Sequence, residues 1–248
     1  MNGRLLRLAK ICPPLKKICI VAMDHGITNG PILGIEDYVN AIRLINQAKP
    51  NAIILHKGLL MKISNFPELA SGNYIMHLSA STLLNKNSHL KVLVASVEEA
   101  IKLGALGVSI HINFGVESDC AMLEDLGLVS RACSEWGIPL LAMVYNHISN
   151  DEIDHIIHSA RIAEELGADI IKIPHPGTQE KVKQIIDKIH IPVIIAGGET
   201  QNDFNIFLKM VKESIEVGAK GIAVGRNIFQ NPDPTLATSQ IIRVLNDD

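Results

Sequence analysis

Lys172 is the residue of this sequence that most directly suggests a reaction, because it interrupts the isoleucine-rich run Asp169–Ile173. An ammonium group inside an apolar strand loses hydration, and this loss favours the neutral amine. A neutral amine can attack a ketone and form a Schiff base, whose protonated imine accepts electrons from a neighbouring C–C bond. The alternative is a structural lysine in an ion pair with Asp24.

Asp24 and Tyr145 are the candidates for the proton transfers that Schiff-base chemistry requires. Asp24 follows the apolar run Ile18–Met23, and Tyr145 closes the run Leu140–Tyr145. The carboxylate could orient the lysine or take the proton of a substrate hydroxyl. The phenol could protonate a carbinolamine or a carbanionic carbon. For either residue alone, a structural hydrogen bond is an equal alternative.

Two glycine-containing segments predict a phosphate site. Gly197 and Gly198 follow one apolar run, and Gly225 and Arg226 follow the next. Glycine allows backbone N–H groups to approach an anion, and a short helix beginning near Asn227 would direct its positive end toward it. The guanidinium of Arg226 would add a charged fork.

Histidines also gather near the ends of the predicted strands. The first strand is not followed by an H-x-H pair and the chain has no H-E-x-x-H motif, so we predict no catalytic metal. We expect His25 and His111 to contact substrate, together with Lys57, which precedes Gly58 and is predicted to lie on a loop. The histidines near strand ends are His25, His56, His77, His111, His147 and His175.

All these residues adjoin short apolar runs rich in isoleucine and valine. Continuous runs of this kind are typical of strands buried on both faces of a parallel sheet. Amphipathic helical patterns separate most of them, and Gly104, Gly137, Gly167 and Gly218 are placed to end helices. The runs are Ile18–Met23, Ala52–Leu55, Tyr74–Leu78, Lys91–Ala95, Val108–Ile112, Leu140–Tyr145, Asp169–Ile173, Val193–Ala196 and Gly221–Val224.

Nine runs are one too many for an eightfold barrel. Lys91–Ala95 is the run we exclude, because Ser96 and Glu99 form a capping box directly after it. We therefore predict a single-domain (β/α)8 TIM barrel over residues 1–248, with a short N-terminal helix that stops at Pro13 and Pro14. A doubly wound open sheet is the alternative, but it predicts a G-x-G-x-x-G motif that does not follow the first strand.

Composition excludes several other classes of protein. The formal net charge of −3 over 248 residues argues against nucleic acid as a partner. No apolar run approaches the roughly 20 residues that a membrane span needs. The four cysteines form no C-x-x-C motif, so we expect reduced thiols and a cytoplasmic protein.

Taken together, these motifs resemble the class I aldolases of the archaeal fructose-bisphosphate aldolase type. The resemblance covers nearly the whole chain and looks closest to the 2-amino-3,7-dideoxy-D-threo-hept-6-ulosonate synthase branch. The segments that carry it are Met23–Gly26, Asn29–Pro31, His56–Gly58, His77–Ser79, Ser109–His111, Asp169–Lys172, Ala196–Gly198 and Ala223–Gln230.

The resemblance implies a Schiff base on Lys172, a carboxylate role for Asp24 and an acid/base role for Tyr145. It places the phosphate site on Gly197, Gly198, Gly225 and Arg226. It implies no cofactor and no metal, a phosphorylated sugar as substrate, and a large homo-oligomer, often a decamer.

Three segments depart from the family pattern. The family's Tyr-Pro-Arg-Gly is here Tyr145–Ile148, which lacks the arginine and leaves the acceptor open. Ile173–His175 replaces a small hydroxyl residue after the lysine, and Glu199-Thr200 replaces Pro-Lys.

We expect an aldolase or transaldolase acting on a phosphorylated ketose. The alternatives are an aldolase of secondary metabolism joining dihydroxyacetone phosphate to an amino-acid aldehyde, a non-catalytic sugar-phosphate-binding regulator and, more distantly, a metal-dependent hydrolase.

Overall fold

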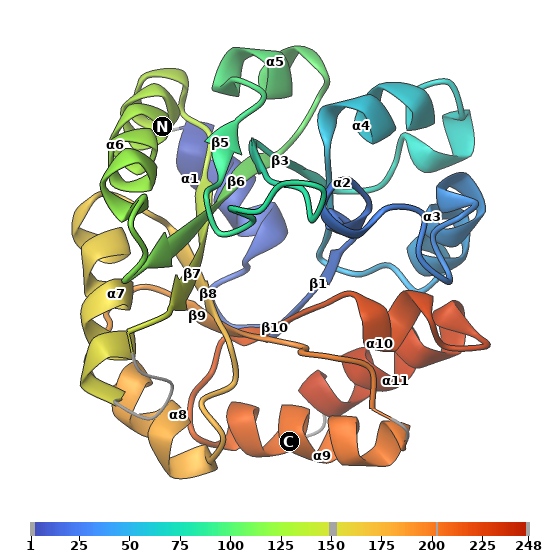
Figure 1. Cartoon of the computed structure of the whole chain (residues 1–248). Helices are drawn as coiled ribbons and strands as arrows, with labels where there is room; N and C mark the ends of the chain where they lie inside the picture. The colour runs from blue at the N-terminus through green and yellow to red at the C-terminus, as the bar shows by residue number, and fades with distance from the viewer. Residues whose placement is uncertain (1–2, 149–152, 202, 247–248) are drawn as a thin grey trace.

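Parallel strands close into a barrel in the computed structural model, which describes residues 3–148, 153–201 and 203–246 (Figure 1). Strand β1 pairs with both β10 and β2, so the sheet has no edge. The predicted barrel is confirmed, and the open-sheet alternative is wrong. The order around the barrel is β1 (Ile18–Ala22), β10 (Gly221–Val224), β9 (Val193–Ala196), β8 (Ile170–Ile173), β7 (Leu140–Asn146), β6 (Gly107–Phe114), β3 (Tyr74–His77) and β2 (Ala52–Leu55).

Helices surround the barrel and connect its strands (Figure 1). The glycines predicted to end helices adopt positive φ angles, and Gly137 is the left-handed C-cap of α6. The helices are α1 (Gly3–Ile11), α2 (His25–Asn29), α3 (Tyr38–Gln47), α4 (Lys57–Ile63), η1 (Pro67–Leu69), α5 (Val97–Lys102), α6 (Asp119–Trp136), α7 (Ile153–Glu165), α8 (Gln179–Ile186), α9 (Phe204–Glu216), α10 (Arg226–Phe229) and α11 (Pro234–Asn246). None of the described helices is both long enough and apolar enough to cross a membrane.

The run Lys91–Ala95 lies outside the barrel, as predicted. Its central residues form β5 (Val92–Leu93), which pairs antiparallel with β4 (Ser79–Ala80). The capping box follows: Ser96 Oγ accepts from Glu99 N at 3.2 Å, and Glu99 Oε2 accepts from Ser96 N at 2.9 Å. In Figure 1 the segment between β4 and β5 lies across the upper part of the barrel opening.

The interior of the barrel has its own apolar core, separate from the core between strands and helices. Alternate residues of each strand point inward, and Ile20, Ile54 and Ile75 are among those that fill the interior. Helix α1 closes the end opposite the carboxyl ends of the strands, where Ile11 packs into the same core. Arg4 fixes this helix by donating to Asp169 Oδ2 at 2.9 Å and to the Gly167 carbonyl at 2.7 Å. The predicted N-terminal helix is therefore confirmed, and the structure adds that it packs against this end of the barrel.

Candidate active site

The inward-facing residues of β7 and β8 change from apolar to reactive toward the carboxyl ends of the strands. Leu141 and Met143 of β7 and Ile170 of β8 belong to the interior core. Tyr145 and Lys172 each follow two residues later on the same face of their strands. Because Lys172 lies opposite Met143 in the β7–β8 register, the amine and the phenol enter the same end of the barrel.

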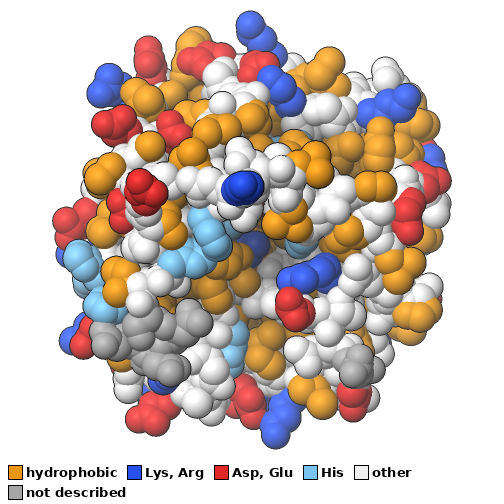
Figure 2. Space-filling model, in the orientation of Figure 1, with side chains coloured by type: hydrophobic (Ala, Val, Ile, Leu, Met, Phe, Trp, Pro, Cys, Tyr) orange, Lys and Arg blue, Asp and Glu red, His pale blue; other side chains and the backbone are white. Residues whose placement is uncertain are grey.

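A cavity of about 360 Å³ opens at this end, and Figure 2 shows the corresponding face hollowed near its centre. Lys172, Tyr145 and His25 line it together with the predicted phosphate residues Gly197, Gly198, Gly225 and Arg226. The remaining lining residues are Ala22, Pro174, His175, Ala196, Glu199, Gln201, Met210 and Ala223. A larger cavity of about 790 Å³, near α3 and η1, contains none of the predicted site residues.

Lys172 is buried, with only 7% of its surface exposed. Its Nζ lies 3.9 Å from Met143 Sδ, and this is its one hydrogen bond among the described residues. A thioether sulfur is a weak acceptor. Within the described part of the chain no carboxylate lies in ion-pair contact with Nζ, so the predicted alternative of a direct pair with Asp24 is not formed.

Asp24 lies beside the lysine but is not part of the cavity wall. Its Oδ1 is 3.8 Å from His25 Nδ1, and its Oδ2 is 3.8 Å from His77 Nε2. Burial alone would raise the pKa of this carboxyl, but His77, His25, Lys172 and His56 more than offset burial and hold the pKa below its ordinary value. Asp24 is therefore an anion within electrostatic reach of the amine.

Burial keeps the histidines around Asp24 neutral near pH 7, and they act on the pKa of Asp24 as cations only in acid, where they take up protons. Burial lowers the pKa of His77 to about 3, against an opposing effect of Asp24. His77 Nδ1 lies 2.9 Å from Ser109 Oγ, and its ring meets that of His56 edge-on at 5.1 Å. Burial also lowers the pKa values of His56 and His25. These rings supply polar contacts without adding full positive charges.

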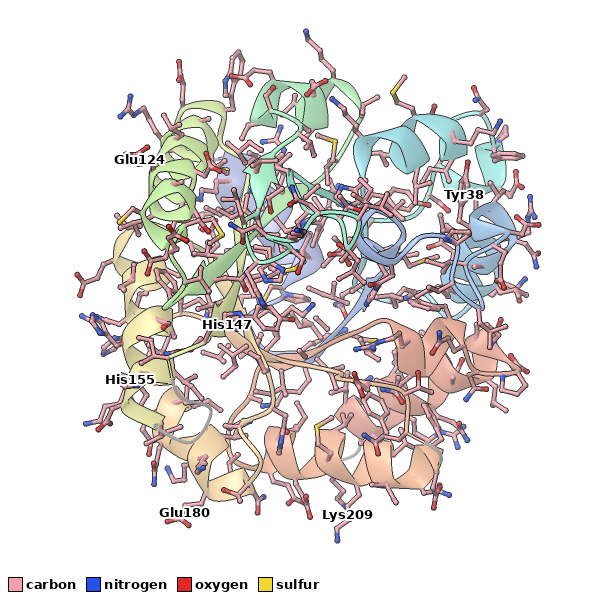
Figure 3. All side chains as sticks on the ribbon, viewed as in Figure 1. Tyr38, Glu124, His147, His155, Glu180 and Lys209 are labelled. Atoms are coloured by element: carbon pink, nitrogen blue, oxygen red, sulfur yellow. The ribbon has the colours of Figure 1, made fainter. Side chains whose placement is uncertain are left out.

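His111 contacts Tyr145 rather than the cavity. The two rings are stacked with centroids 4.4 Å apart and planes 17° apart. His111 Nε2 lies 3.0 Å from Asn113 Oδ1, which is also 3.0 Å from His147 Nε2. His147, labelled in Figure 3, directly follows β7 at the position where the family pattern has arginine. His111 therefore does not line the cavity, and its ring faces the phenol of Tyr145.

The two loops predicted to bind phosphate require glycine because other backbone passes very close. A Cβ on Gly225 would lie 2.6 Å from the Ala22 carbonyl oxygen, and one on Gly197 would lie 3.0 Å from Val224 Cα. Arg226, the first residue of α10, donates to the Gly198 carbonyl at 3.2 Å. Two strand ends therefore bring backbone amides and one guanidinium to the same side of the cavity.

Asn227 is a site residue that the sequence did not single out beyond the start of a helix. Its Nδ2 donates to the carbonyls of Gly197 at 3.0 Å and Glu199 at 2.9 Å. Its Oδ1 accepts from Gln201 N at 2.9 Å. Asn227 thereby fixes the loop after β9 to α10. The feature of the sequence that could have identified Asn227 as a site residue is its position directly after Gly225 and Arg226.

Lys57 is a predicted site residue whose amine the structure pairs with a carboxylate outside the cavity. It is the first residue of α4 rather than part of a loop, and its Nζ lies 3.2 Å from Glu99 Oε1. It does not line the cavity. Conversely, His175 was predicted only to lie near the rim, but it lines the cavity. Its Nδ1 accepts a hydrogen bond from Gly177 N at 3.1 Å. Among the described residues, no three or more His, Cys, Asp or Glu side chains are grouped to hold a metal ion.

Comparisons with known proteins agree with this geometry. A model of the DeoC/LacD family of aldolases matches residues 18–231. The 2-amino-3,7-dideoxy-D-threo-hept-6-ulosonate synthase 1 of Archaeoglobus fulgidus is 40% identical over 235 residues, which cover 94% of this chain and 87% of that protein. The 2-amino-4,5-dihydroxy-6-oxo-7-(phosphonooxy)heptanoate synthase of Streptomyces griseus is 35% identical over 225 residues, or 88% of this chain and 81% of that protein.

A solved structure gives the same result for the fold and for the type of chemistry. An archaeal fructose-1,6-bisphosphate aldolase, with its catalytic lysine covalently bound to the carbinolamine intermediate of the substrate, superposes with a TM-score of 0.87. It is 28% identical, and the match covers 98% of this chain and 99% of that one. The chain therefore belongs to the DeoC/LacD family of aldolases, and it is an aldolase of the class I, Schiff-base-forming type.

Proposed function

We propose that this protein makes or breaks a C–C bond in a phosphorylated ketose through an imine on Lys172. One observation carries the proposal: a single cavity of about 360 Å³ is lined by the amine of Lys172, the phenol of Tyr145 and the anion-binding loops at Gly197 and Gly225. An imine-forming group, an acid/base and a phosphate site are the parts that such a reaction requires.

In the cleavage direction, the amine nitrogen of Lys172 adds to the keto carbon of the substrate. The hydroxyl of the resulting carbinolamine takes a proton from Tyr145 and leaves as water, which gives an iminium ion. The iminium accepts the electron pair of the neighbouring C–C bond while a base removes the proton of the adjacent hydroxyl, and an aldehyde is released. The remaining enamine takes up a proton, and water then hydrolyses the imine.

Asp24 acts through its charge in this scheme. Because it is ionised, only partly exposed and absent from the cavity wall, it stabilises the positive iminium on Lys172 without competing as a nucleophile. The backbone amides at Gly198 and Gly225 bind the substrate phosphate together with Arg226. The Gly197 amide already donates to the Ala223 carbonyl at 2.9 Å, so Gly197 contributes the close approach of its backbone rather than a hydrogen bond. No cofactor or metal enters these steps.

A second candidate reaction is the joining of dihydroxyacetone phosphate to an amino-acid aldehyde. The name of the Streptomyces griseus relative describes a seven-carbon amino acid with a 6-oxo and a 7-phosphonooxy group. Breaking the bond between carbons 4 and 5 of such a molecule yields dihydroxyacetone phosphate and a four-carbon amino-acid aldehyde. The exchange of the family's arginine for His147 at the rim is compatible with an acceptor other than a sugar phosphate.

The substrates can be separated by direct assay of the full chain. The protein is incubated with fructose 1,6-bisphosphate, and separately with dihydroxyacetone phosphate plus the four-carbon amino-acid aldehyde, and products are identified by mass spectrometry. Turnover of either set that is lost in Lys172→Met supports the proposal. Binding of sugar phosphates without turnover of either set would support the regulator and contradict an active aldolase.

A homo-oligomer, with a decamer as the expected size, and a cytoplasmic location are also proposed. Large apolar side chains are exposed on the surface and could be buried in an interface between copies of the chain. Among them are Leu15, Leu33, Leu83 and Leu84. Size-exclusion chromatography with light scattering measures the assembly directly, and a monomer at micromolar concentration would contradict it.

A further inference from the structure

Asn113 lies near the carboxyl end of β6, where it is 3% exposed and opposite Tyr145 in the β6–β7 register. Asn113 and His111 point to the same face of β6, because they are two residues apart on one strand. The side chain of Asn113 therefore sits behind the catalytic cavity, next to the phenol that we assign to proton transfer.

The hydrogen bonds of Asn113 determine which way its amide faces. Its Nδ2 donates to the carbonyl oxygen of His89 at 2.6 Å, and a carbonyl oxygen can only accept. The Oδ1 atom therefore faces His111 Nε2 and His147 Nε2, each 3.0 Å away. Because an amide oxygen only accepts, both imidazoles must carry a proton on Nε2.

This arrangement determines the chemical form of His111. Burial, and after it the charge of Lys91, hold the pKa of His111 well below its ordinary value, so the ring is neutral and its Nδ1 carries no proton. The neutral ring lies flat on Tyr145, at 4.4 Å between centroids and 17° between planes. The hydrogen bond from Nε2 to Asn113 fixes the orientation of the His111 ring, and the fixed ring in turn restricts the orientation of the Tyr145 phenol that is stacked on it.

The same amide also connects the site to two segments at its rim. The carbonyl of His89 belongs to the segment between β4 and β5, and His147 follows β7. The rings of these two histidines contact each other edge-on at 4.6 Å. A movement of His89 or His147 would therefore shift the Asn113 amide. The amide would in turn shift His111 and the phenol of Tyr145 stacked on it.

We propose that Asn113 is a positioning residue for Tyr145: its amide fixes the tautomer and the orientation of His111, on which the phenol is stacked, and ties both to the rim histidines. The inference rests on the proposed imine mechanism, in which Tyr145 moves protons after Lys172 has bound the ketose. Its consequence is that Asn113 controls the proton-transfer steps without controlling donor binding.

The test compares Asn113→Ala and Asn113→Asp with the wild type in two measurements. One is the equilibrium yield of the dihydroxyacetone phosphate adduct on Lys172, measured by borohydride reduction after the adduct has stopped accumulating, so that a slower dehydration of the carbinolamine does not lower it. The other is the rate at which the enzyme exchanges a proton on the hydroxyl-bearing carbon of dihydroxyacetone phosphate for deuterium from D₂O. In that exchange the iminium gives the proton to the acid/base group, forms the enamine, and takes a deuteron back.

In Asn113→Ala we expect the adduct yield to stay within about twofold of wild type while the exchange rate falls about tenfold or more. In Asn113→Asp a carboxylate would face both imidazoles and raise the pKa of His111, so the acid limb of the pH–rate profile should move to higher pH. The isosteric aspartate variant keeps the test decisive if the alanine variant does not fold. Asn51→Ala is the matched control, since Asn51 Oδ1 accepts from Cys19 N at the other end of the barrel.

Two outcomes would overturn the role of Asn113. One is exchange within about twofold of wild type in both variants with no shift of the pH profile. The other is a loss of adduct and exchange by the same factor, which indicates a merely structural residue. A wild-type protein that forms no adduct with dihydroxyacetone phosphate or fructose 1,6-bisphosphate contradicts the proposed function itself and removes the basis of the inference.

Discussion

Lys172 Nζ lies 3.9 Å from Met143 Sδ, its partner across the β7–β8 register. The buried amine therefore has a weak acceptor as its hydrogen-bond partner and no carboxylate in direct contact within the described residues. Lys220 shows the contrast, because its Nζ donates to the carbonyls of Pro13 at 2.7 Å and Pro14 at 2.6 Å. Strong carbonyl acceptors hold that lysine as a structural cation, whereas Lys172 is left available to a substrate carbonyl.

Replacing Tyr145 by phenylalanine separates the hydroxyl from the ring. Phenylalanine can keep the stack on His111 but cannot move a proton, so we expect turnover to fall by about a hundredfold or more with little loss of thermal stability. Steady-state kinetics and thermal unfolding measure the two effects. Tyr38→Phe is the control, because Tyr38 lies on α3 at the periphery of the molecule in Figure 3 and does not line the cavity. Turnover close to wild type in the Tyr145 variant would show that another group moves the proton.

Replacing Arg226 by alanine tests the phosphate site. We expect KM for a phosphorylated ketose to rise by about tenfold to a hundredfold, because a charge-assisted contact to the phosphate is lost, while kcat changes less. Dihydroxyacetone, which has no phosphate, should react equally well with both proteins. Arg243→Ala, on the exposed side of α11, is the matched control. If KM for the phosphorylated substrate does not move, the phosphate binds elsewhere.

His77 gives the stability of the protein a defined pH dependence. Its pKa is about 3 in the folded protein and near 6.5 when unfolded, so the unfolded chain binds an additional proton between these values. The free energy of unfolding should therefore fall as the pH falls from 6.5 toward 3, and this contribution should be constant above 6.5.

Urea unfolding between pH 4.5 and 6.5 tests this on His77→Gln, which does not titrate. The slope of the unfolding free energy against pH should decrease by up to about 1.4 kcal/mol per pH unit relative to wild type. Equal slopes in the two proteins would mean that His77 is already charged in the folded state.

The positions of Lys172 and Tyr145 could be predicted because strand geometry is local. Continuous apolar runs mark strands buried on both faces, and the carboxyl ends of all barrel strands share one face. The capping box at Ser96 was enough to exclude the preceding run from the barrel. The cavity-lining glycines Gly197 and Gly225 were likewise recognisable by their place directly after β9 and β10.

The contacts of Lys57 and His111 could not be predicted in the same way, because they depend on segments distant in sequence. Lys57 lies next to Gly58, which suggested a loop, but Glu99 lies 42 residues further along the chain and meets its amine at the start of α4. His111 stacks on Tyr145 only because β6 pairs with β7 in one particular register. Local patterns identify strands and caps, whereas side-chain partners across strands require the assembled barrel.

The central claim is that Lys172 is the residue that binds the ketose covalently. Borohydride reduction in the presence of dihydroxyacetone phosphate or fructose 1,6-bisphosphate, followed by peptide mass mapping, identifies the modified lysine. We predict one adduct, on Lys172, and none in Lys172→Met, while Lys220→Met still forms it. An adduct on Lys57 or Lys91 instead, or no adduct with either sugar phosphate, would contradict the account.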